Sequence, residues 1–258
     1  MHIKEQFLKL LPRNAFLYRV AKRYVDRYNN ENESNMHTNG ELRLMQTVLP
    51  RCATVFDVGA NVGDWMALAL KINPRLKIHC FEPSTATFQR LQARGGGAVC
   101  NNFGLSSAPS EMTLWVFAEG AGINSLYKRQ GLEDGWGLAE QKQTETVRLD
   151  TLDAYCHRVG VPVIDLMKVD VEGHELEVFK GAIGMLAQGK IKRIQFEYGG
   201  CNIDSRVLLK DLFDFLLPYG FTFYKVFPHE LRRVPRYDQR LENFQYQNWV
   251  AVTNDVLL

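Results

Sequence analysis

Two short segments of this sequence hold most of the side chains that could do chemistry. In the first, a β-branched and aromatic run typical of a buried strand contains Asp57 and leads into a turn with Gly59, Asn61 and Gly63. Glycine allows a sharp turn that lies close to a ligand, and good helix formers follow. Open α/β sheets bind ligands just beyond the carboxyl ends of their strands. The turn is therefore a predicted ligand site.

The spacing of the glycines indicates which ligand the turn binds. A dinucleotide fingerprint would have glycine where this chain has Asn61 and Asp64, and a P-loop would have Lys and Ser or Thr directly after Gly63. Asp57 and Asp64 flank the turn, where they would repel a pyrophosphate and favour a cation. S-adenosylmethionine carries a sulfonium and an ammonium. We therefore predict that it binds here, at Asp57, Gly59, Asn61 and Gly63.

A second acidic position supports the same ligand. Glu82 ends the next predicted strand, precedes Pro83 and lies 23 residues after Gly59, close to the spacing at which a carboxylate reaches ribose hydroxyls. Its alternative role is to complement the dipole of the helix that follows. After a third predicted strand, Asn102 and Phe103 are expected near adenine, or else as a turn residue and a core aromatic.

The second segment, residues 163–176, predicts a central strand followed by ionisable residues. Such a cluster is costly unless its members serve one another or a ligand. The members are Asp170, Glu172, His174 and Glu175, with Lys168 and Lys180 as partners in an alternative, purely structural network. Because an unperturbed histidine has a pKa near 6.5, His174 is the best-matched general base, with Asp170 and Glu172 expected to orient it or to replace it. Asp170 is also predicted to contact the cofactor, as is Pro83 beside Glu82.

The acceptor and a metal ion have weaker signals. The glycine-rich stretch 118–144 is predicted to be a lid over the acceptor, with Asn124, Ser125 and Leu126 as its ordered contact and Trp136 as a packing anchor. Glu197 and Tyr198 end a further strand at the same rim. A metal-free site is favoured, although Asp170, Glu172 and Glu197 are an alternative Mg²⁺ site. Four arginines in residues 228–242 are expected in a solvated turn, or else beside an anionic acceptor.

Composition and charge exclude several classes of protein. A net charge of +2 gives no reason to expect nucleic acid, and five cysteines without a C-x-x-C pair suit a reducing compartment. The chain has neither a long apolar run nor a signal-peptide core, which favours a cytoplasmic location. Residues 1–30 read as basic amphipathic helix, with seven basic and two acidic side chains. A helical cap is expected for 1–50; contact with an anionic membrane is the alternative.

Together these motifs resemble the FkbM family of S-adenosylmethionine-dependent methyltransferases. The matching segments are residues 55–63, 81–83, 102–106, 168–178 and 180–182, of which the fourth is the most specific. The resemblance covers roughly residues 54–252. It implies a Rossmann-like, doubly wound α/β sheet of seven strands, mostly parallel with a final antiparallel strand, in a domain spanning 51–258.

The resemblance also implies O-methylation of a sugar, a glycolipid or polysaccharide, or a natural product. By the same resemblance, Gly59, Asn61 and Gly63 would hold the methionine portion, Glu82 the ribose and Asn102 the adenine side. A nucleotide-sugar or NAD-dependent oxidoreductase and a non-catalytic scaffold are the alternatives. The acceptor's identity and the oligomeric state are not indicated.

Overall fold

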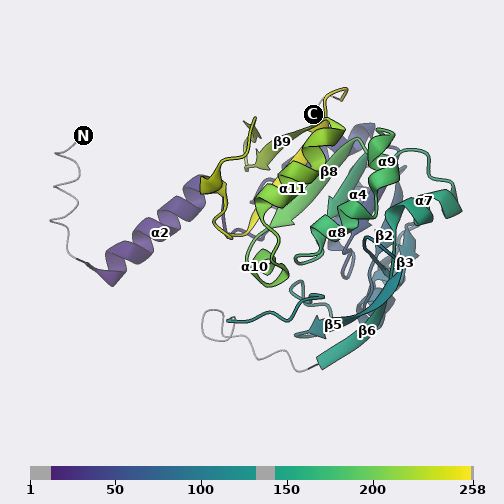
Figure 1. Ribbon diagram of the computed structural model, residues 1–258, viewed down its shortest axis with the longest axis horizontal. Helices are drawn as coiled ribbons and strands as arrows, with labels where there is room; N and C mark the ends of the chain where they lie inside the picture. Colours follow the sequence, from purple (N-terminus) through teal and green to yellow (C-terminus); the bar gives the residue numbers. More distant parts are fainter. Residues whose placement is uncertain (1–12, 132–142, 257–258) are drawn as a thin grey trace.

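A computed structural model describes residues 13–131 and 143–256 (Figure 1). In the described residues, eight strands form one sheet in the order β10-β9-β11-β8-β7-β1-β2-β3. All neighbours pair in parallel except around β11 and β10, which run antiparallel to theirs. The strands are β1 (Thr54–Val58), β2 (Lys77–Phe81), β3 (Val99–Asn101), β7 (Leu166–Val169), β8 (Arg193–Tyr198), β9 (Phe221–Val226), β10 (Leu231–Val234) and β11 (Gln247–Thr253).

Helices cover both faces of this sheet, because successive strand residues point to opposite sides. On β1, Phe56 packs in one apolar cluster and its neighbour Val55 in another. The Phe56 cluster takes residues from α7 (Leu152–Val159), α8 (Glu175–Lys180), α9 (Ile183–Ala187) and α11 (Leu209–Leu216). The Val55 cluster takes residues from α3 (Glu41–Val48), η1 (Leu49–Arg51), α4 (Asp64–Ile72) and α5 (Thr85–Arg94). The predicted doubly wound fold is confirmed.

Two predicted elements differ from the structure. Residues 231–234, expected within a solvated turn, form the edge strand β10, so the described sheet has eight strands and not seven. The helix expected over 173–185 is divided into α8 and α9 at Gly181. A Cβ on Gly181 would lie 2.0 Å from the carbonyl oxygen of Ser106, so the position between the two helices has no room for a side chain.

A small second sheet lies beside the carboxyl ends of β1 and β2. It has the order β4-β6-β5, formed by β4 (Gly104–Leu105), β5 (Ser110–Val116) and β6 (Gln143–Asp150). β6 is much longer than the predicted strand 147–149, because it pairs with the whole of β5. The segment between these strands includes residues 118–131, which return toward the main sheet; the predicted anchor Trp136 lies outside the described residues.

The N-terminal helix does not pack as the predicted cap. α2 (Ala15–Asn29) has no buried residue and extends away from the rest of the molecule (Figure 1). Only the chain that follows it enters the fold, where Asn30 and Glu31 are buried. Within the described residues, no helix combines the length and apolar character that crossing a bilayer requires.

Candidate functional site

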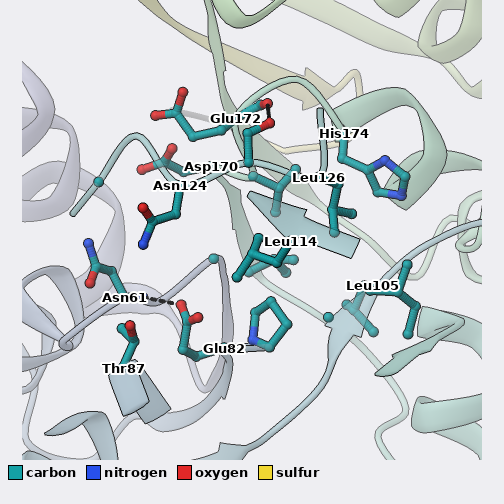
Figure 2. Close-up of a pocket in the computed structure, with 18 of the residues that line it drawn as sticks. Asn61, Glu82, Thr87, Leu105, Leu114, Asn124, Leu126, Asp170, Glu172 and His174 are labelled. Atoms are coloured by element: carbon teal, nitrogen blue, oxygen red, sulfur yellow. Dashed lines mark hydrogen bonds between the residues drawn. The ribbon is translucent and has the colours of Figure 1, made fainter. Parts of the chain in front are cut away.

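A pocket lies where the carboxyl ends of β1, β2 and β7 face residues 121–126 (Figure 2). Most of the predicted cofactor residues that line it come from two turns, after β1 and after β2. Five predicted cofactor residues are in the lining: Gly59, Asn61, Glu82, Pro83 and Asp170. Four predicted catalytic or acceptor residues also line it: Glu172, His174, Asn124 and Ser125. Parallel strands therefore bring the two chemical segments of the sequence to one cavity, as expected.

Glu82 is fixed in the pocket wall by two backbone donors. The Asn61 N–H donates to its Oε2 at 3.0 Å (Figure 2), and the Ser84 N–H donates to its Oε1 at 2.9 Å. Burial raises the pKa of Glu82 to about 7, against the lowering effect of these two donors. Each oxygen of a carboxylate can accept more than one hydrogen bond. Glu82 is thus oriented by the protein and retains acceptor capacity on both oxygens.

Gly59 allows the turn after β1 to touch the end of β7. Its φ is +80°, and a Cβ there would lie 1.8 Å from the carbonyl oxygen of Asp170. Any side chain would push apart the two strand ends that form the back of the pocket. Asn61, two residues later, is also left-handed at φ +47°, and its side-chain amide donates to the Gly120 carbonyl at 3.1 Å.

The predicted electrostatic roles of Asp57 and Asp64 are wrong. Asp57 is fully buried beneath the pocket and outside its lining, with Lys168 Nζ at 3.9 Å; burial raises its pKa to about 6. Asp64 is exposed at the start of α4 and pairs with Arg94. Gly63, likewise outside the lining, caps α4 in a left-handed conformation. The carboxyl groups that line the pocket belong instead to the turns after β2 and β7: Glu82, Asp170 and Glu172.

Asn102 and Phe103 have the contacts of their alternative roles. The Asn102 side-chain amide donates to the backbone carbonyls of Glu82 and Pro83, both at 3.1 Å, so it holds the turn that presents Glu82. Phe103 packs edge-on against Phe81, with ring centroids 5.6 Å apart, in the core. Neither residue lines the pocket. The apolar wall is formed instead by Leu105, Leu114, Leu126 and Leu149. Leu105 belongs to the matching segment 102–106 and Leu126 to the predicted contact 124–126, whereas nothing in the local sequence had marked Leu114 and Leu149.

The acidic side of the pocket is built around Glu172. Its backbone is left-handed at φ +52°, a conformation uncommon for a residue with a side chain. Arg129 Nη1 lies 2.8 Å from its carboxylate, and the Ser125 hydroxyl donates to its carbonyl at 2.7 Å. Burial, followed by the charge of Asp170, raises its pKa to about 8. Sequence reasoning missed Arg129 because it lies 43 residues away on the segment over the pocket.

His174 is buried and fully hydrogen-bonded. Its Nδ1 lies 2.9 Å from the Tyr127 hydroxyl and its Nε2 lies 2.9 Å from the Ser106 hydroxyl. Burial lowers its pKa to about 4, so the ring is neutral near pH 7. Neutral imidazole has one donor and one acceptor nitrogen, and the two hydroxyls match both. The ring is thus held in one orientation, and its low pKa makes it a weak base.

Hydrogen bonds to β5 and within the loop itself hold the segment over the pocket in place. The backbone of Ser125 exchanges two hydrogen bonds with Trp115 of β5, at 2.8 and 3.1 Å. The Asn124 side chain accepts from the Phe117 N–H and donates to the Ala118 carbonyl, so its polar atoms stabilise the loop. Residues 124–126 are therefore ordered at the pocket, whereas their contact with an acceptor stays a prediction.

Glu197 and Tyr198 point in different directions, because neighbouring residues of a strand lie on opposite faces. Tyr198 is fully buried in the core and its hydroxyl donates to Glu242 at 2.6 Å, so the predicted acceptor contact is wrong. Glu197 lies on the Asp170 side but outside the pocket lining, and the Tyr246 hydroxyl donates to it at 2.6 Å. Burial raises its pKa well above the ordinary range.

The candidate metal group does come together. One oxygen from each of Asp170, Glu172 and Glu197 lies within 4.8 Å of the others. Protein cations already accompany these acids, however: Lys168 Nζ is 2.8 Å from Asp170 Oδ2, and Arg129 pairs with Glu172. Burial alone would lower the pKa of Lys168. The charges of Asp170 and Asp57 outweigh this effect, so the pKa lies above its usual value. Lys168 is therefore a permanent internal counter-ion of the cluster.

Sequence comparison assigns the part of the chain that forms this pocket to a protein family. The family model described as the methyltransferase FkbM domain matches residues 57–223, which include the turns after β1, β2 and β7. The chain belongs to the FkbM methyltransferase family. The FkbM domain thus contains every residue of the pocket named above, and the resemblance seen in the motifs is confirmed.

Relatives that match this chain have different names and lengths. The 31-O-demethyl-FK506 methyltransferase FkbM of Streptomyces tacrolimicus is 30% identical over 154 residues, 49% of this chain and 58% of the relative. The hexuronic acid methyltransferase AglP of Haloferax volcanii is 27% identical over 174 residues, 66% of each chain. The AMB antimetabolite synthetase AmbE of Pseudomonas aeruginosa matches at 29% over 181 residues, only 8% of its length. These matches span from a small fraction to about two thirds of each relative.

Among solved structures, the methyltransferase FkbM of Methylobacillus flagellatus KT is similar to this chain. Its sequence identity is 14% and its TM-score is 0.47, over 77% of this chain and 43% of that one.

Proposed function

We propose that this chain transfers a methyl group from S-adenosylmethionine to a hydroxyl of a sugar, a glycolipid or polysaccharide, or a natural product. The observation that carries the proposal is the Glu82 carboxylate, oriented in the pocket wall by the N–H groups of Asn61 and Ser84. Its free acceptor capacity suits the paired hydroxyls of a ribose. Relatives described as hexuronic acid and FK506 methyltransferases support the two acceptor classes.

The rest of the pocket suits the remaining parts of this cofactor. Leu105, Leu114 and Leu149 offer an apolar wall for adenine. The close approach of Gly59 to Asp170 leaves backbone, and not side chain, beside the methionine portion. The carboxylates of Asp170 and Glu172 face the same cavity and favour a ligand that carries positive charge (Figure 2).

When bound, S-adenosylmethionine supplies a methyl carbon that its sulfonium has already activated. The protein has to align the acceptor oxygen and receive the hydroxyl proton; positioning can supply about 7–11 kcal/mol and proton acceptance about 10²–10⁴-fold in rate. In this proposal Asp170 receives the proton. Lys168 holds its Oδ2 at 2.8 Å and fixes the side chain at the pocket rim. His174 is a positioning residue, because both ring nitrogens already have partners.

Isothermal titration with S-adenosylhomocysteine and with NAD tests the cofactor. We expect binding of the first only, and about ten- to hundredfold weaker binding for Glu82→Gln, since hydrogen bonds to a charged group are lost. The matched control is Glu111→Gln, because Glu111 is exposed on β5 and outside the pocket. Preferential NAD binding would favour the oxidoreductase alternative.

Methyl transfer to a panel of glycans and hydroxylated natural products tests the reaction. Asp170→Asn should lower kcat by about 10²–10⁴-fold while S-adenosylhomocysteine still binds, and His174→Gln should have a smaller effect. Excess chelator should leave the rate unchanged, because Lys168 and Arg129 already accompany the acids. Full turnover in Asp170→Asn would show that Asp170 does not receive the hydroxyl proton. Cofactor binding without methyl transfer to any acceptor would favour the non-catalytic scaffold alternative.

A further inference from the structure

The N-terminal helix α2 is amphipathic, and its apolar side faces away from the protein. With 3.6 residues per turn, residues four apart form rows along a helix. Around α2 these rows are basic (Arg19, Arg23, Arg27), apolar (Phe16, Val20, Tyr24, Tyr28), apolar again (Leu17, Ala21, Val25) and mixed (Tyr18, Lys22, Asp26). The two apolar rows are adjacent, and the basic row borders the first of them.

Lys22 and Asp26 of the mixed row face the body of the protein, whereas Tyr18, nearer the start of the helix, is 68% exposed. Lys22 Nζ donates to Asp26 at 2.7 Å and to the Gln245 side chain at 3.0 Å. At the end of the helix, the Asn30 side chain donates to the Asn39 and Val226 carbonyls. Next to it, Glu31 forms a buried ion pair with Lys225 at 2.9 Å. These contacts fix the rotation of α2 about its own axis.

The apolar rows consequently face away from the protein. The side of the helix opposite Lys22 and Asp26 bears Phe16, Tyr24 and Tyr28, which are 71%, 70% and 65% exposed. Val20 and Leu17 are about half exposed, at 50% and 49%. A helix on a soluble surface normally turns its apolar stripe inward. This inverted arrangement leaves a continuous apolar face that the described part of the chain does not cover.

We propose that α2 docks on a bilayer that contains anionic lipid, lying in the headgroup region with its apolar rows toward the acyl chains. The basic row flanks the apolar rows, so Arg19, Arg23 and Arg27 reach lipid phosphates as the apolar side chains enter. Tyrosines at the edge of such a face suit this depth, because the ring is apolar and the hydroxyl remains wet. The catalytic domain is then held at the surface through Asn30 and Glu31.

Charge distinguishes a bilayer from a second copy of the chain as the occupant. Asp26 is the sole acid of α2 and is already paired with Lys22. Because α2 carries four basic side chains against one acid, two copies that met through their apolar rows would bring net positive charge together, and like charges oppose association. An anionic surface complements the same arginines.

Co-sedimentation of the full chain with vesicles tests the proposal. We expect binding to phosphatidylcholine vesicles that contain about 30% phosphatidylglycerol, little binding to phosphatidylcholine alone, and weaker binding as salt is raised. The triple variant Phe16→Ser, Val20→Ser, Tyr24→Ser and the triple variant Arg19→Gln, Arg23→Gln, Arg27→Gln should each weaken binding by about tenfold or more. The matched control replaces three exposed apolar residues elsewhere with serine: Val159, Ile183 and Ile203.

Unchanged binding in either α2 variant, or equal loss in the control, would overturn the proposal. So would a stable dimer, measured by light scattering, that the Phe16, Val20 and Tyr24 substitutions convert to monomer, because the apolar face would then belong to a second copy. S-adenosylhomocysteine titration of the same variants keeps the two proposals separate, since α2 lies outside the pocket.

Discussion

Individual ionisable residues in this pocket are tuned mainly by burial. Burial raises the pKa of Glu82 to about 7 and of Glu172 to about 8, and it lowers the pKa of His174 to about 4. The carboxylates therefore become better proton acceptors while the imidazole becomes a worse one. A base is most effective when its pKa lies near the working pH. The same physical cause thus makes His174, which the sequence suggested as the general base, a poor proton acceptor near pH 7, and this favours a carboxylate in the role proposed above for Asp170.

The buried histidine should also make stability depend on pH. Because its pKa is about 4 in the folded protein and near 6.5 when unfolded, the folded state is favoured above pH 6.5 and loses this advantage as pH falls toward 4. Between pH 7 and 5 the loss should be about 2 kcal/mol from this residue. Urea unfolding at both pH values measures it as the difference between wild type and His174→Gln.

The carboxylates with raised pKa act in the opposite direction over this range, which is why the difference from the variant, and not the wild-type trend, is the informative quantity. His157→Gln is the matched control, because His157 is exposed on α7. If His174→Gln shows the same pH dependence as wild type, the buried ring does not titrate as stated.

At the scale of elements, the pocket depends on how closely the ends of β1 and β7 approach. Val58 pairs with Val169 at the end of the parallel ladder, and the next residues of both strands are in contact through Gly59 and the Asp170 carbonyl. The turn after β2 joins them through the Asn61 to Glu82 hydrogen bond. The three strand ends therefore act as one unit, and its geometry rests on a backbone contact.

Gly59→Ala should consequently be severe. The left-handed backbone alone costs an alanine roughly 1–2 kcal/mol, and the added methyl must also displace the Asp170 carbonyl, 1.8 Å away. We expect a loss of more than about 2 kcal/mol in unfolding free energy, measured by denaturant, or loss of S-adenosylhomocysteine binding. Gly160→Ala is the matched control: its φ is +71° but nothing lies within 4 Å. Equal losses of stability in the two variants would show that the contact between Gly59 and the Asp170 carbonyl does not contribute to the effect.

At the scale of the whole molecule, the chain has a catalytic body and an attached helix. The body has two apolar clusters, one on each face of the sheet, whereas α2 contributes no buried residue to either. The connection after α2 is polar but buried, through Asn30 and the Glu31 to Lys225 ion pair. These polar contacts hold the end of α2 against the body but bury no apolar side chain of the helix in the core.

Deleting residues 1–28 should therefore leave the body intact. We expect the unfolding free energy and S-adenosylhomocysteine affinity to change by less than about 0.5 kcal/mol, since α2 buries nothing, while vesicle binding is lost. Deleting residues 1–31 removes Asn30 and Glu31 and is the contrasting variant; it should destabilise the body, because Lys225 loses its buried partner. A large loss of stability in the shorter deletion would mean that α2 belongs to the fold.

The main parallel strands and the meeting of the two chemical segments were determined by the sequence. Apolar runs that end in Gly59, Glu82 and Asp170 predict parallel strands, and parallel strands place their carboxyl ends together. These patterns depend only on neighbouring residues, so they can be recognised in the sequence before the fold is known. The same is true of the turn residues: the glycines and acids stand at strand ends in the structure as they do in the sequence.

Only the tertiary structure decided which of these groups face the ligand. Burial and pairing depend on residues distant in the chain: Lys168 neutralises Asp57, Tyr127 and Ser106 hold His174, and Glu242 takes the Tyr198 hydroxyl. The apolar face of α2 is the clearest case. Its amphipathic pattern is visible in the sequence, but whether the apolar side turns inward or outward was fixed by contacts of Lys22 and Asn30 with segments more than 190 residues away.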